Sequence, residues 1–465
     1  MKKLTLEEIA AAMGVRSVDK LPRIGVSRIC TDSRDLRHGD LFFALPGRQF
    51  DGHDFVDAAL SGGAVAAIVA DVGRVPARWR EAGRLIVVPD TVDALGRLAG
   101  YHRTQSAAVV IGVVGSNGKT TTKELIHAVL RSRKSGKAAA RSFNNHIGVP
   151  LTLLSTDAAD EYVVVEIGTN RPGEVAALAQ IARPDLGVVT SLGEEHLEYL
   201  GDLAGVAEEE LSLLAHIRRR GWAVLNHECR ARPQVARRED LSVLSFGFQP
   251  DADLRASDVT VVEGRQRFRV NGRFEYELPA LGVHNVSNAL AAVAVGLRFG
   301  MTHADIALAL AKAALPPQRL EPSRVGDVMI LNDAYNANPA SMRAALATLD
   351  QLPPRGRRVL VLGDMRELGA DTLRYHEELG RAAGRSSAAV IVAVGAFARN
   401  VADGAISIAG TGKRIYWHPS IETAGPALER LIEPGDIVLL KGSRAVRMER
   451  LIPFIERLAT TRVPA

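Results

Sequence analysis

The sequence of 465 residues has few cysteines, few aromatic residues and no long apolar run. Its two cysteines, Cys30 and Cys229, cannot form a disulfide framework or a cysteine-rich zinc site. Aromatic residues make up 5% of the chain, too few for the base-stacking surfaces of proteins that bind single-stranded nucleic acid. No apolar run approaches the ~18 residues of a transmembrane helix, and Glu7 and Glu8 interrupt any signal-like segment behind Met1-Lys2-Lys3. We therefore expect a cytoplasmic protein with no membrane insertion.

The charges are nearly balanced and spread along the sequence. Hydrophobic residues make up 47% and charged residues 24%, which is typical of a soluble globular protein and not of a disordered chain, a collagen or a coiled coil. The net charge is +5, and basic residues form only short clusters such as Arg218-Arg219-Arg220. We interpret this as a solvated basic surface that suits anionic small molecules, and we expect no nucleic-acid partner.

At the usual ~150 residues per domain, the chain has room for three domains. Residues 1–105 mix short strands and helices, and the polar and then small residues at 101–107 suggest a boundary. The strand-like runs of this first part lie at 41–45, 64–70 and 85–88. We expect a small α/β N-terminal domain here.

The centre of the chain, residues 106–316, alternates apolar runs with helical stretches. The apolar runs at 109–114, 162–165 and 186–189 are continuous, as in strands buried on both faces of a parallel sheet. This alternation predicts a doubly wound, mostly parallel sheet.

A second series of strands and helices begins after Pro316-Pro317. A helical pattern such as that at 341–349 separates strand-like runs, which lie at 328–331, 358–362, 390–394 and 437–440. We predict that residues 317–465 form a Rossmann-like α/β C-terminal domain, which makes the chain a three-domain α/β protein.

The strongest local signal is a glycine-rich segment between the first central strand and a helical run at 123–130. In this position backbone N–H groups can close on phosphate, and the helix N-terminus adds its positive dipole. Lys119 would reach the terminal phosphates, and the Thr120 hydroxyl would hold Mg²⁺. Val113 stands where the motif G-x-x-x-x-G-K-[ST] has its first glycine, so a plain strand-to-helix turn is the alternative. The predicted ATP-binding segment is Gly115, Ser116, Asn117, Gly118, Lys119, Thr120 and Thr121.

Two further expected strands are followed by candidate ligands. Glu166 ends the run at 162–165, and His196 lies a few residues beyond the run at 186–189. In open α/β sheets ligands bind beyond the carboxyl ends of the strands, where a carboxylate can hold Mg²⁺ beside phosphates. A strand-end glutamate alone is more often a solvated loop residue. A phosphate loop, an acid and an imidazole at three strand ends together predict a nucleotide and metal site.

Longer motifs resemble the Mur ligase family over nearly the whole chain. The similar segments are 31–34, 39–42, 50–55, 142–150, 166–170, 284–290, 332–339, 363–369 and 441–444. The stretch Tyr335-Asn336-Ala337-Asn338-Pro339 discriminates most, since the family members that add diaminopimelate or lysine carry an aspartate-tyrosine-alanine-histidine pattern there. A helix cap at Asn338 with Pro339 at the first helical position is a structural reading that can hold as well.

The resemblance implies an ATP-dependent amide ligase with ATP and Mg²⁺ as cofactors. In the implied reaction, ATP phosphorylates the C-terminal carboxylate of UDP-N-acetylmuramoyl-tripeptide, and the amine of D-alanyl-D-alanine attacks the acyl phosphate. Bringing two anions together requires dense positive charge, which Lys119 and Mg²⁺ would supply. Because the last domain contributes to the ATP site, domain closure is the expected gating motion. We expect a monomer.

The resemblance also assigns roles to individual residues. The implied catalytic residues are Lys119, Glu166 and His196. The implied Mg²⁺ ligands are Thr120, Glu166 and His196. The implied nucleotide contacts outside the loop are Asn288 at the adenine, Arg319 and Asp333. The implied contacts with the UDP-sugar-peptide are Ser33, Asn144 and Asn145.

Three positions depart from the family pattern. Ser191 stands where asparagine is common, and Val283 replaces the usual arginine before His284-Asn285. Glu210 occupies the place of a lysine that is carbamylated by CO₂ and supports the second Mg²⁺ in the family.

The acidic run at 208–210 lies in a predicted helix, which advances about 100° per residue. The apolar residues within roughly 40° of Glu210 are Val206, Leu214 and Ile217. Glu208 and Glu209 are expected to point away from this side. Because a buried lone carboxylate is unfavourable unless it is paired or bound to metal, we hypothesise that Glu210 replaces the carbamylated lysine as a ligand of the second Mg²⁺. Its stem is shorter by on the order of 3–4 Å, which favours a bridging water; a solvated helix face is the alternative.

Three other functions remain open at this point. Within the same class they are another Mur-type amino-acid ligase and a folylpolyglutamate synthase, and the stretch 335–339 argues against both. The third is a nucleotide-gated binding module without ligase chemistry, against which Glu166, His196 and Arg319 argue. The sequence does not say whether the third residue of the tripeptide is diaminopimelate or lysine.

Overall fold

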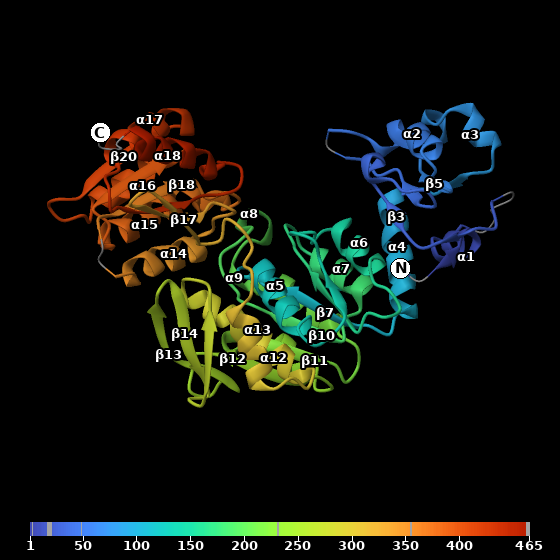
Figure 1. Cartoon of the computed structure of the whole chain (residues 1–465), viewed down its shortest axis with the longest axis horizontal. Helices are drawn as coiled ribbons and strands as arrows, with labels where there is room; N and C mark the ends of the chain where they lie inside the picture. Colours follow the sequence, from blue (N-terminus) through green and yellow to red (C-terminus); the bar gives the residue numbers. More distant parts are fainter. Residues whose placement is uncertain (2, 16–20, 48, 230–231, 354–355, 462–465) are drawn as a thin grey trace.

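The computed structural model describes residues 1, 3–15, 21–47, 49–229, 232–353 and 356–461. The chain is an α/β protein, as predicted, and its sheets lie in three regions. In Figure 1 the N-terminal region (blue) and the C-terminal region (orange to red) stand on either side above the central region. None of the described helices combines the length and the apolar character that a membrane span requires.

The N-terminal region is built on a four-stranded parallel sheet in the order β3-β4-β5-β6. The three runs predicted as strands are confirmed as β4, β5 and β6, and a small antiparallel pair, β1 with β2, lies apart from this sheet. The elements are β1 (Leu4–Thr5), α1 (Leu6–Ala12), β2 (Gly25–Val26), β3 (Ile29–Cys30), η1 (Ser33–Asp35), β4 (Leu41–Phe43), η2 (Gly52–Phe55), α2 (Val56–Ser61), β5 (Ala66–Val69), η3 (Val72–Arg74), α3 (Ala77–Glu81), β6 (Leu85–Val87) and α4 (Thr91–Gln105).

The central region is a nine-stranded sheet in the order β15-β14-β13-β12-β11-β10-β7-β9-β8. Neighbours from β8 to β13 are parallel, and β13, β14 and β15 add an antiparallel edge. The strands are β7 (Val109–Val114), β8 (Gly136–Ala138), β9 (Tyr162–Glu166), β10 (Leu186–Val189), β11 (Trp222–Asn226), β12 (Ser242–Gly247), β13 (Leu254–Val262), β14 (Arg265–Val270) and β15 (Phe274–Leu278).

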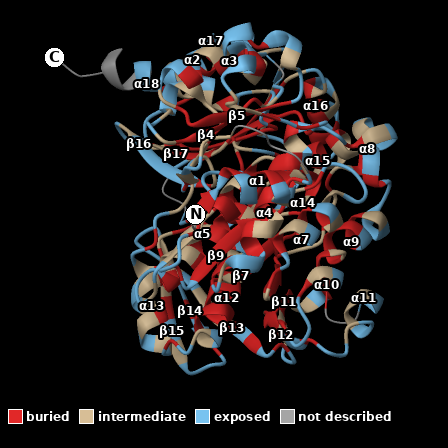
Figure 2. Ribbon diagram, turned by 90° about the vertical axis from the view of Figure 1, so that its right-hand side faces the viewer, coloured by how far each residue is buried: buried red, intermediate tan, exposed pale blue. Residues whose placement is uncertain are grey.

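Helices cover both faces of this central sheet, which explains its continuous apolar strands. In β7, Val110 and Val114 face one core, whereas Ile111 and Val113 face the other. Figure 2 shows the resulting burial, with buried residues concentrated in the strands and in the inner faces of the helices. The helices are α5 (Lys119–Leu130), α6 (Gly148–Leu154), α7 (Glu174–Ala182), α8 (Leu197–Leu200), α9 (Leu203–Leu211), α10 (Leu213–His216), α11 (Pro233–Ala236), α12 (Val283–Arg298) and α13 (His303–Ala311), with η4 (His227–Cys229).

The C-terminal region is a six-stranded sheet in the order β16-β17-β21-β18-β19-β20. All neighbours are parallel except β16, an edge strand that pairs antiparallel with β17 and carries Pro322. The four predicted strands are confirmed as β17, β18, β19 and β21. The elements are β16 (Glu321–Val325), β17 (Val328–Asp333), α14 (Pro339–Gln351), β18 (Arg358–Gly363), η5 (Gly369–Asp371), α15 (Thr372–Arg385), β19 (Val390–Val394), α16 (Ala398–Ile406), β20 (Arg414–His418), α17 (Ile421–Leu431), β21 (Ile437–Lys441), η6 (Met448–Leu451) and α18 (Ile452–Thr461).

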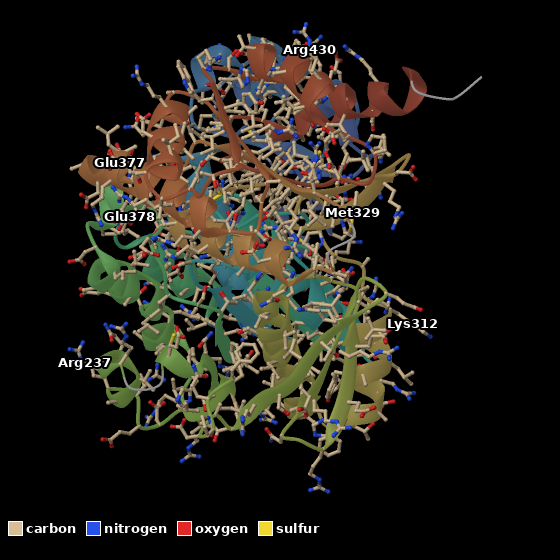
Figure 3. The ribbon with its side chains drawn as sticks, turned by 90° about the vertical axis from the view of Figure 1, so that its left-hand side faces the viewer. Arg237, Lys312, Met329, Glu377, Glu378 and Arg430 are labelled. Carbon is tan, nitrogen blue, oxygen red and sulfur yellow. The ribbon has the colours of Figure 1, made fainter. Side chains whose placement is uncertain are left out.

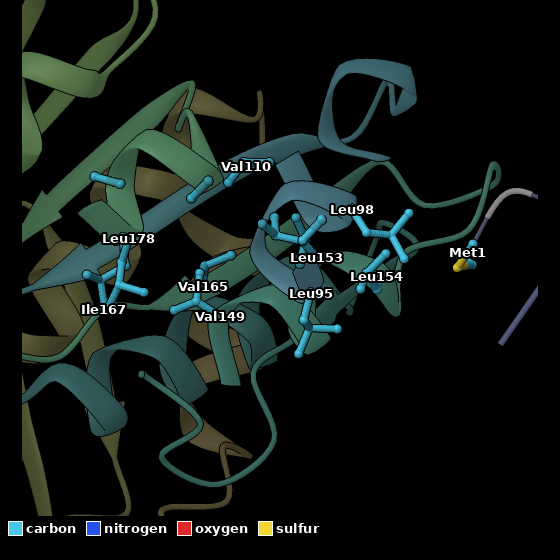
Figure 4. Packing of buried hydrophobic residues seen from close by; sticks show 14 of the residues in the cluster. Met1, Leu95, Leu98, Val110, Val149, Leu153, Leu154, Val165, Ile167 and Leu178 are labelled. Atoms are coloured by element: carbon cyan, nitrogen blue, oxygen red, sulfur yellow. The ribbon is translucent and has the colours of Figure 1, made fainter. Parts of the chain in front are cut away.

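Helix α4 joins the N-terminal region to the central region through a shared core. Figure 4 shows Leu95 and Leu98 of α4 close to Leu153 and Leu154 of α6, and all four belong to one cluster of buried residues. The same cluster includes Leu6 and Ile68 of the N-terminal region. The two regions are thus packed together and not merely linked.

Arg103, near the end of α4, fixes this joint by polar contacts. Its guanidinium donates to the backbone carbonyls of Ala182 and Arg183 and to Asp185 Oδ2, the last at 2.6 Å. The Arg103 side chain is 4% exposed, whereas Arg97 on the same helix is 57% exposed and pairs with Asp93 one turn away.

Replacing Arg103 with alanine should therefore loosen the joint. We expect the free energy of unfolding to fall by about 3 kcal/mol, the lower end for a broken buried ion pair, because Asp185 keeps its bonds with Arg218 and the Val110 N–H. Arg97→Ala is the control and should change the free energy of unfolding by less than about 1 kcal/mol. Urea unfolding followed by tryptophan fluorescence measures both, and equal midpoints for the two variants would contradict the role of Arg103.

Candidate active site

The phosphate loop lies at the carboxyl end of β7, whose neighbours in the sheet are β10 and β9. Val113 of β7 pairs with Glu166 of β9, and Val114 pairs with Val189 of β10. The three strands therefore end at one edge of the sheet. The loop, Glu166 and the segment that carries His196 all emerge at this edge.

Two glycines give the loop its shape. Gly115 and Gly118 have φ angles of 125° and 86°, which favour glycine. A Cβ at Gly115 would collide with Thr190 Oγ1, and one at Gly118 would collide with Asn288 Oδ1. Gly118 is the N-cap of α5, and no described side chain caps this helix. The first N–H groups of α5 are therefore open to a phosphate.

The strand end of β10 holds the phosphate loop in place. The hydroxyl of Thr190 donates to the Asn117 carbonyl at 2.6 Å. The Ser191 hydroxyl accepts from the Asn117 N–H at 3.0 Å and donates to the Asn117 carbonyl at 3.1 Å. Ser116 exchanges hydrogen bonds with the backbone of Gly193. A serine at position 191 thus serves both backbone groups of Asn117 where the family usually has asparagine.

Lys119 begins α5 and lies between two carboxylates. Its Nζ donates to the Gly115 carbonyl at 2.6 Å and lies 3.5 Å from Glu195 Oε2 and 3.7 Å from Glu210 Oε1. Burial alone would lower the pKa of Lys119, but the carboxylates of Glu195 and Glu210 outweigh burial and raise it. The side chain therefore keeps its positive charge next to the loop.

Glu166 and Thr120 offer oxygen ligands beside the loop. The Thr120 hydroxyl donates to Glu166 Oε1 at 3.1 Å, and Asn144 Nδ2 donates to the same oxygen at 3.0 Å. Glu166 is buried, and its Oε2 accepts no hydrogen bond from any described residue. Glu195 Oε1 and Glu210 Oε1 are buried and also accept no hydrogen bond from a described residue, although Glu166 Oε2 lies 3.8 Å from Lys123 Nζ and Glu210 Oε1 lies 3.7 Å from Lys119 Nζ.

These oxygens without hydrogen bonds fit a hard cation such as Mg²⁺, which prefers oxygen ligands. Within the described part of the chain, no cluster of three or more His, Cys, Asp or Glu side chains is placed to hold a metal ion. Glu166, His196 and Glu210 therefore do not form one metal-binding group in this structure.

His196 lies at the N-cap of α8 with a φ of 49°. Its Nδ1 hydrogen-bonds with Glu367 Oε2 of the C-terminal region, and its Nε2 lies 3.8 Å from Glu195 Oε2. The imidazole is thus held between the C-terminal region and the carboxylate beside Lys119.

The C-terminal region reaches the phosphate loop with the side chains of Arg319 and Asn338. Arg319 donates to Thr120 Oγ1 at 2.9 Å and stacks on the Tyr335 ring at 4.2 Å. Asn338 Nδ2 donates to Asn117 Oδ1 at 3.0 Å. Asn338 is also the N-cap of α14, with Pro339 in the first turn. The structural interpretation of this motif is therefore confirmed, since Asn338 caps a helix, and Asn338 contacts the phosphate loop as well.

A cavity of about 660 Å³ lies between the two regions at this point. The predicted residues that line it are Ser116, Asn117, Gly118, Lys119, Thr120, Thr121, Asn144, Asn145, Glu166, His196, Asn288, Arg319 and Asp333. Asn145 Oδ1 accepts from the Ile147 and Gly148 N–H groups, and Asn288 lies against Gly118. Asp333 forms an ion pair with Lys441 at 2.7 Å.

Three predicted residues are not among those that line the cavity: Gly115, Ser33 and Glu210. Gly115 forms the base of the loop, and Ser33 lies in η1 of the N-terminal region. Glu210 is fully buried behind the loop, where its Oε2 accepts from the Gly115 N–H at 2.7 Å. Burial raises the pKa of Glu210 well above its usual range, against the attraction of Lys119.

The expectation that Glu209 points away from the apolar side is wrong. Glu208 is exposed, but Glu209 is buried and its carboxylate accepts from the Thr169 hydroxyl and from the N–H groups of Gly173 and Val175, at the start of α7. Its partners belong to another helix, so periodicity along α9 could not reveal them.

Sequence reasoning missed several residues of the site, which are Glu195, Glu367, Ser142, Tyr335 and Asn338. Tyr335 and Asn338 lie in the discriminating motif, which predicts no particular contact for them. For Glu195 the available signal is its position next to His196. For Glu367 the available signal is its place in the segment 363–369, which resembles the family but implies no role for a particular residue.

Comparison with known families covers all three regions. The model of the Mur ligase middle domain matches residues 113–296, and that of the Mur ligase glutamate ligase domain matches residues 318–444. A third model, of the Mur ligase family catalytic domain, matches residues 25–103. The UDP-N-acetylmuramoyl-tripeptide–D-alanyl-D-alanine ligase of Bacillus subtilis is 34% identical over 455 residues, which cover 97% of this chain and 98% of that protein.

Solved structures agree with this assignment. The chain superposes on a crystal structure of MurF from Acinetobacter baumannii with a TM-score of 0.85 and 30% identity, over 99% of both chains. It superposes on MurF ligase from Thermotoga maritima in complex with ADP with a TM-score of 0.81 and 30% identity, over 94% of this chain and 99% of the other. The chain belongs to the Mur ligase family.

Proposed function

We propose that this chain is the ATP-dependent ligase that joins D-alanyl-D-alanine to UDP-N-acetylmuramoyl-tripeptide in peptidoglycan synthesis. The observation that carries the proposal is the cavity in which the phosphate loop meets Arg319, Tyr335 and Asn338 of the C-terminal region. A relative with this activity in its name covers nearly the whole chain at 34% identity. Four residues of the discriminating stretch, Tyr335 to Asn338, line the cavity itself.

The cations around the loop explain how two anions can react there. Lys119 and Arg319 place positive charge at the phosphate loop, and the open N–H groups of α5 add donors for the phosphate oxygens. The tripeptide carboxylate attacks the γ-phosphorus of ATP, and ADP leaves. The amine of D-alanyl-D-alanine then attacks the acyl carbon, and phosphate leaves.

Thr120, Glu166 and His196 would lie around the Mg²⁺ ions, and Glu210, which lies behind the loop, would support the second Mg²⁺ through water. Bound there, Mg²⁺ supplies positive charge at the phosphate oxygens. Glu195 is a further candidate for a group that orients the bound Mg²⁺. Its Oε2 lies 3.5 Å from Lys119 Nζ, and its buried Oε1 accepts no hydrogen bond from a described residue.

Substrate contacts outside the ATP site follow from the same proposal. Asn144 and Asn145 line the cavity on the side of Glu166 and would contact the UDP-sugar-peptide, together with Ser33 of the N-terminal region. Asn288 would meet the adenine. The proposed enzyme has three domains, which span residues 1–105, 106–316 and 317–465, and it acts as a monomer.

The acyl-phosphate route predicts a transfer of oxygen. When the tripeptide carboxylate carries ¹⁸O, one labelled oxygen should appear in the released phosphate, because that oxygen bridges the acyl carbon and the phosphorus before the amine attacks. Mass spectrometry of the phosphate measures the transfer. Unlabelled phosphate would rule out activation by phosphoryl transfer.

A panel of acceptors and amines separates the remaining alternatives. The proposal requires a product from UDP-tripeptide and D-alanyl-D-alanine, with ATP hydrolysis that depends on both. A product with free diaminopimelate or lysine would indicate another Mur-type ligase, and one with glutamate and a folate would indicate a folylpolyglutamate synthase. Nucleotide binding without any product would indicate a binding module.

A further inference from the structure

Glu367 joins the C-terminal region to the predicted catalytic histidine by two contacts. Its Oε2 accepts a hydrogen bond from His196 Nδ1, and its backbone carbonyl accepts from the Glu198 N–H at 3.1 Å. The side chain and the backbone of one residue thus hold both ends of the turn that begins α8. The two partners are 171 positions apart in sequence, so the contact depends entirely on how the C-terminal region docks.

The turn is closely fitted on both sides. Glu367 and His196 have φ angles of 62° and 49°, which residues other than glycine rarely adopt. A Cβ at Gly369 would lie 3.3 Å from the Cα of Glu198. This close backbone approach brings the Glu367 side chain, which is 43% exposed, against the imidazole, whose side chain is 16% exposed.

The loop that carries Glu367 is anchored to the rest of its region. Met365 N–H donates to His376 Nε2, and Arg366 N–H donates to Ser443 Oγ, both at 3.0 Å. The Asp364 carboxylate accepts from the N–H groups of Ala396 and Phe397. The loop therefore moves with the C-terminal region as one body.

A carboxylate that accepts a hydrogen bond from Nδ1 of a histidine leaves Nε2 as the nitrogen that can accept a proton or bind a metal ion. A histidine that donates from Nδ1 presents the lone pair of Nε2, and a carboxylate partner is the usual way to fix the orientation of a metal-binding imidazole. Here Nε2 faces Glu195, next to Lys119. The ring is thus oriented toward the site by a residue from outside the central region.

We propose that Glu367 is a positioning residue that orients His196 only when the C-terminal region is docked, so that docking completes the active site. The proposal rests on the ligase function above and adds the element that links domain closure to catalysis. The proposal also gives the segment 363–369 a role. This segment carries the carboxylate that contacts His196 when the C-terminal region is docked.

The test compares Glu367→Ala and Glu367→Gln with the parent enzyme. Glu367→Ala should lower kcat about tenfold, the lower end for loss of a partner behind a metal-binding histidine, with little change in the KM for D-alanyl-D-alanine. Glu367→Gln keeps an oxygen that accepts from Nδ1 and should restore most of the lost turnover. A purely structural role would not separate alanine from glutamine in this way.

A double-mutant cycle tests the route through His196. In a His196→Ala background, Glu367→Ala should cause no further loss, because its only proposed target is gone. Glu378→Gln is the matched control: Glu378 lies on the outer surface of the same region (Figure 3), pairs with Arg374 on its own helix, and should leave kcat unchanged. Additive losses, or a Glu367→Ala enzyme as fast as the control, would overturn the proposal.

A binding measurement keeps the proposal testable apart from turnover. Calorimetric titration with ADP should show weaker binding to Glu367→Ala only when Mg²⁺ is present, since the proposed effect passes through the metal-facing nitrogen. An equal loss with and without Mg²⁺ would overturn the proposal. If the parent fails to make the pentapeptide product but shows this Mg²⁺-dependent difference, the proposed function fails and the role of Glu367 stands.

Discussion

Replacing Lys119 with alanine should lower kcat by roughly 10²–10³-fold or more while the protein remains folded, because a charge contact to the transferring phosphate is lost. The structure gives the reason in detail. Lys119 Nζ lies at the base of the phosphate loop between the carboxylates of Glu195 and Glu210. Without this cation, the Glu195 carboxylate that lines the cavity would repel the incoming phosphates, and Glu210 behind the loop would lose its basic partner.

The control for this experiment is Lys134→Ala. Lys134 lies just beyond the end of α5 and forms an exposed ion pair with Glu161, so its loss should leave turnover unchanged. Steady-state kinetics measures both variants, and circular dichroism with a thermal melt checks that they fold. Near-normal turnover in a folded Lys119→Ala enzyme would show that this loop is not the ATP site.

Glu210→Ala should lower turnover by roughly 10–100-fold, the range for a residue that orients a metal site from behind. Its carboxyl group is fully buried and accepts from the Gly115 N–H, and its Oε1 lies 3.7 Å from Lys119 Nζ without a hydrogen bond. Glu208→Ala is the matched control, since Glu208 is exposed on the same helix. The parent enzyme should also be indifferent to bicarbonate depletion, because a glutamate needs no CO₂ to become a carboxylate.

A second variant separates the two roles open to Glu210. Glu210→Gln keeps an oxygen that can accept from Gly115 N–H but loses the charge. If Glu210 supports Mg²⁺, Glu210→Gln should be impaired as well and should need more Mg²⁺ for half-maximal activity. If Glu210 only anchors the loop, Glu210→Gln should behave like the parent. Normal activity of Glu210→Ala across a Mg²⁺ titration would contradict both roles.

The strands and the phosphate loop were predictable because their signals are local. An apolar run buried on both faces, followed by Gly115 to Thr121 and a helix, specifies strand, turn and helix within about twenty residues. The parallel sheet then places Glu166 beside the loop, because neighbouring parallel strands end at one edge. The assignment of residues to ligands came from the family resemblance and not from these patterns.

The rest of the site could not be predicted because it depends on contacts between elements far apart in the chain. Glu367 meets His196, and Asn338 meets Asn117, only after two regions with separate sheets have docked. The prediction that Glu209 points away from the apolar side is wrong for a related reason. The N–H groups that stabilise its buried carboxylate belong to α7 and to the turn before it. Helical periodicity reports where apolar side chains lie, but it cannot report which buried polar side chains find partners.

The shared core at α4 limits how this protein can be rearranged by recombination. Leu95 and Leu98 pack into the central region, and Arg103 bonds to the backbone at the end of α7, so a crossover at residue 105 would separate residues that contact one another. A crossover before Thr91, where α4 begins, would keep these contacts within one parent but would divide α4 from Leu6 and Ile68, which share its core. Either crossover therefore cuts through one core, so we expect chimaeras to fold only when both parents have compatible side chains around α4.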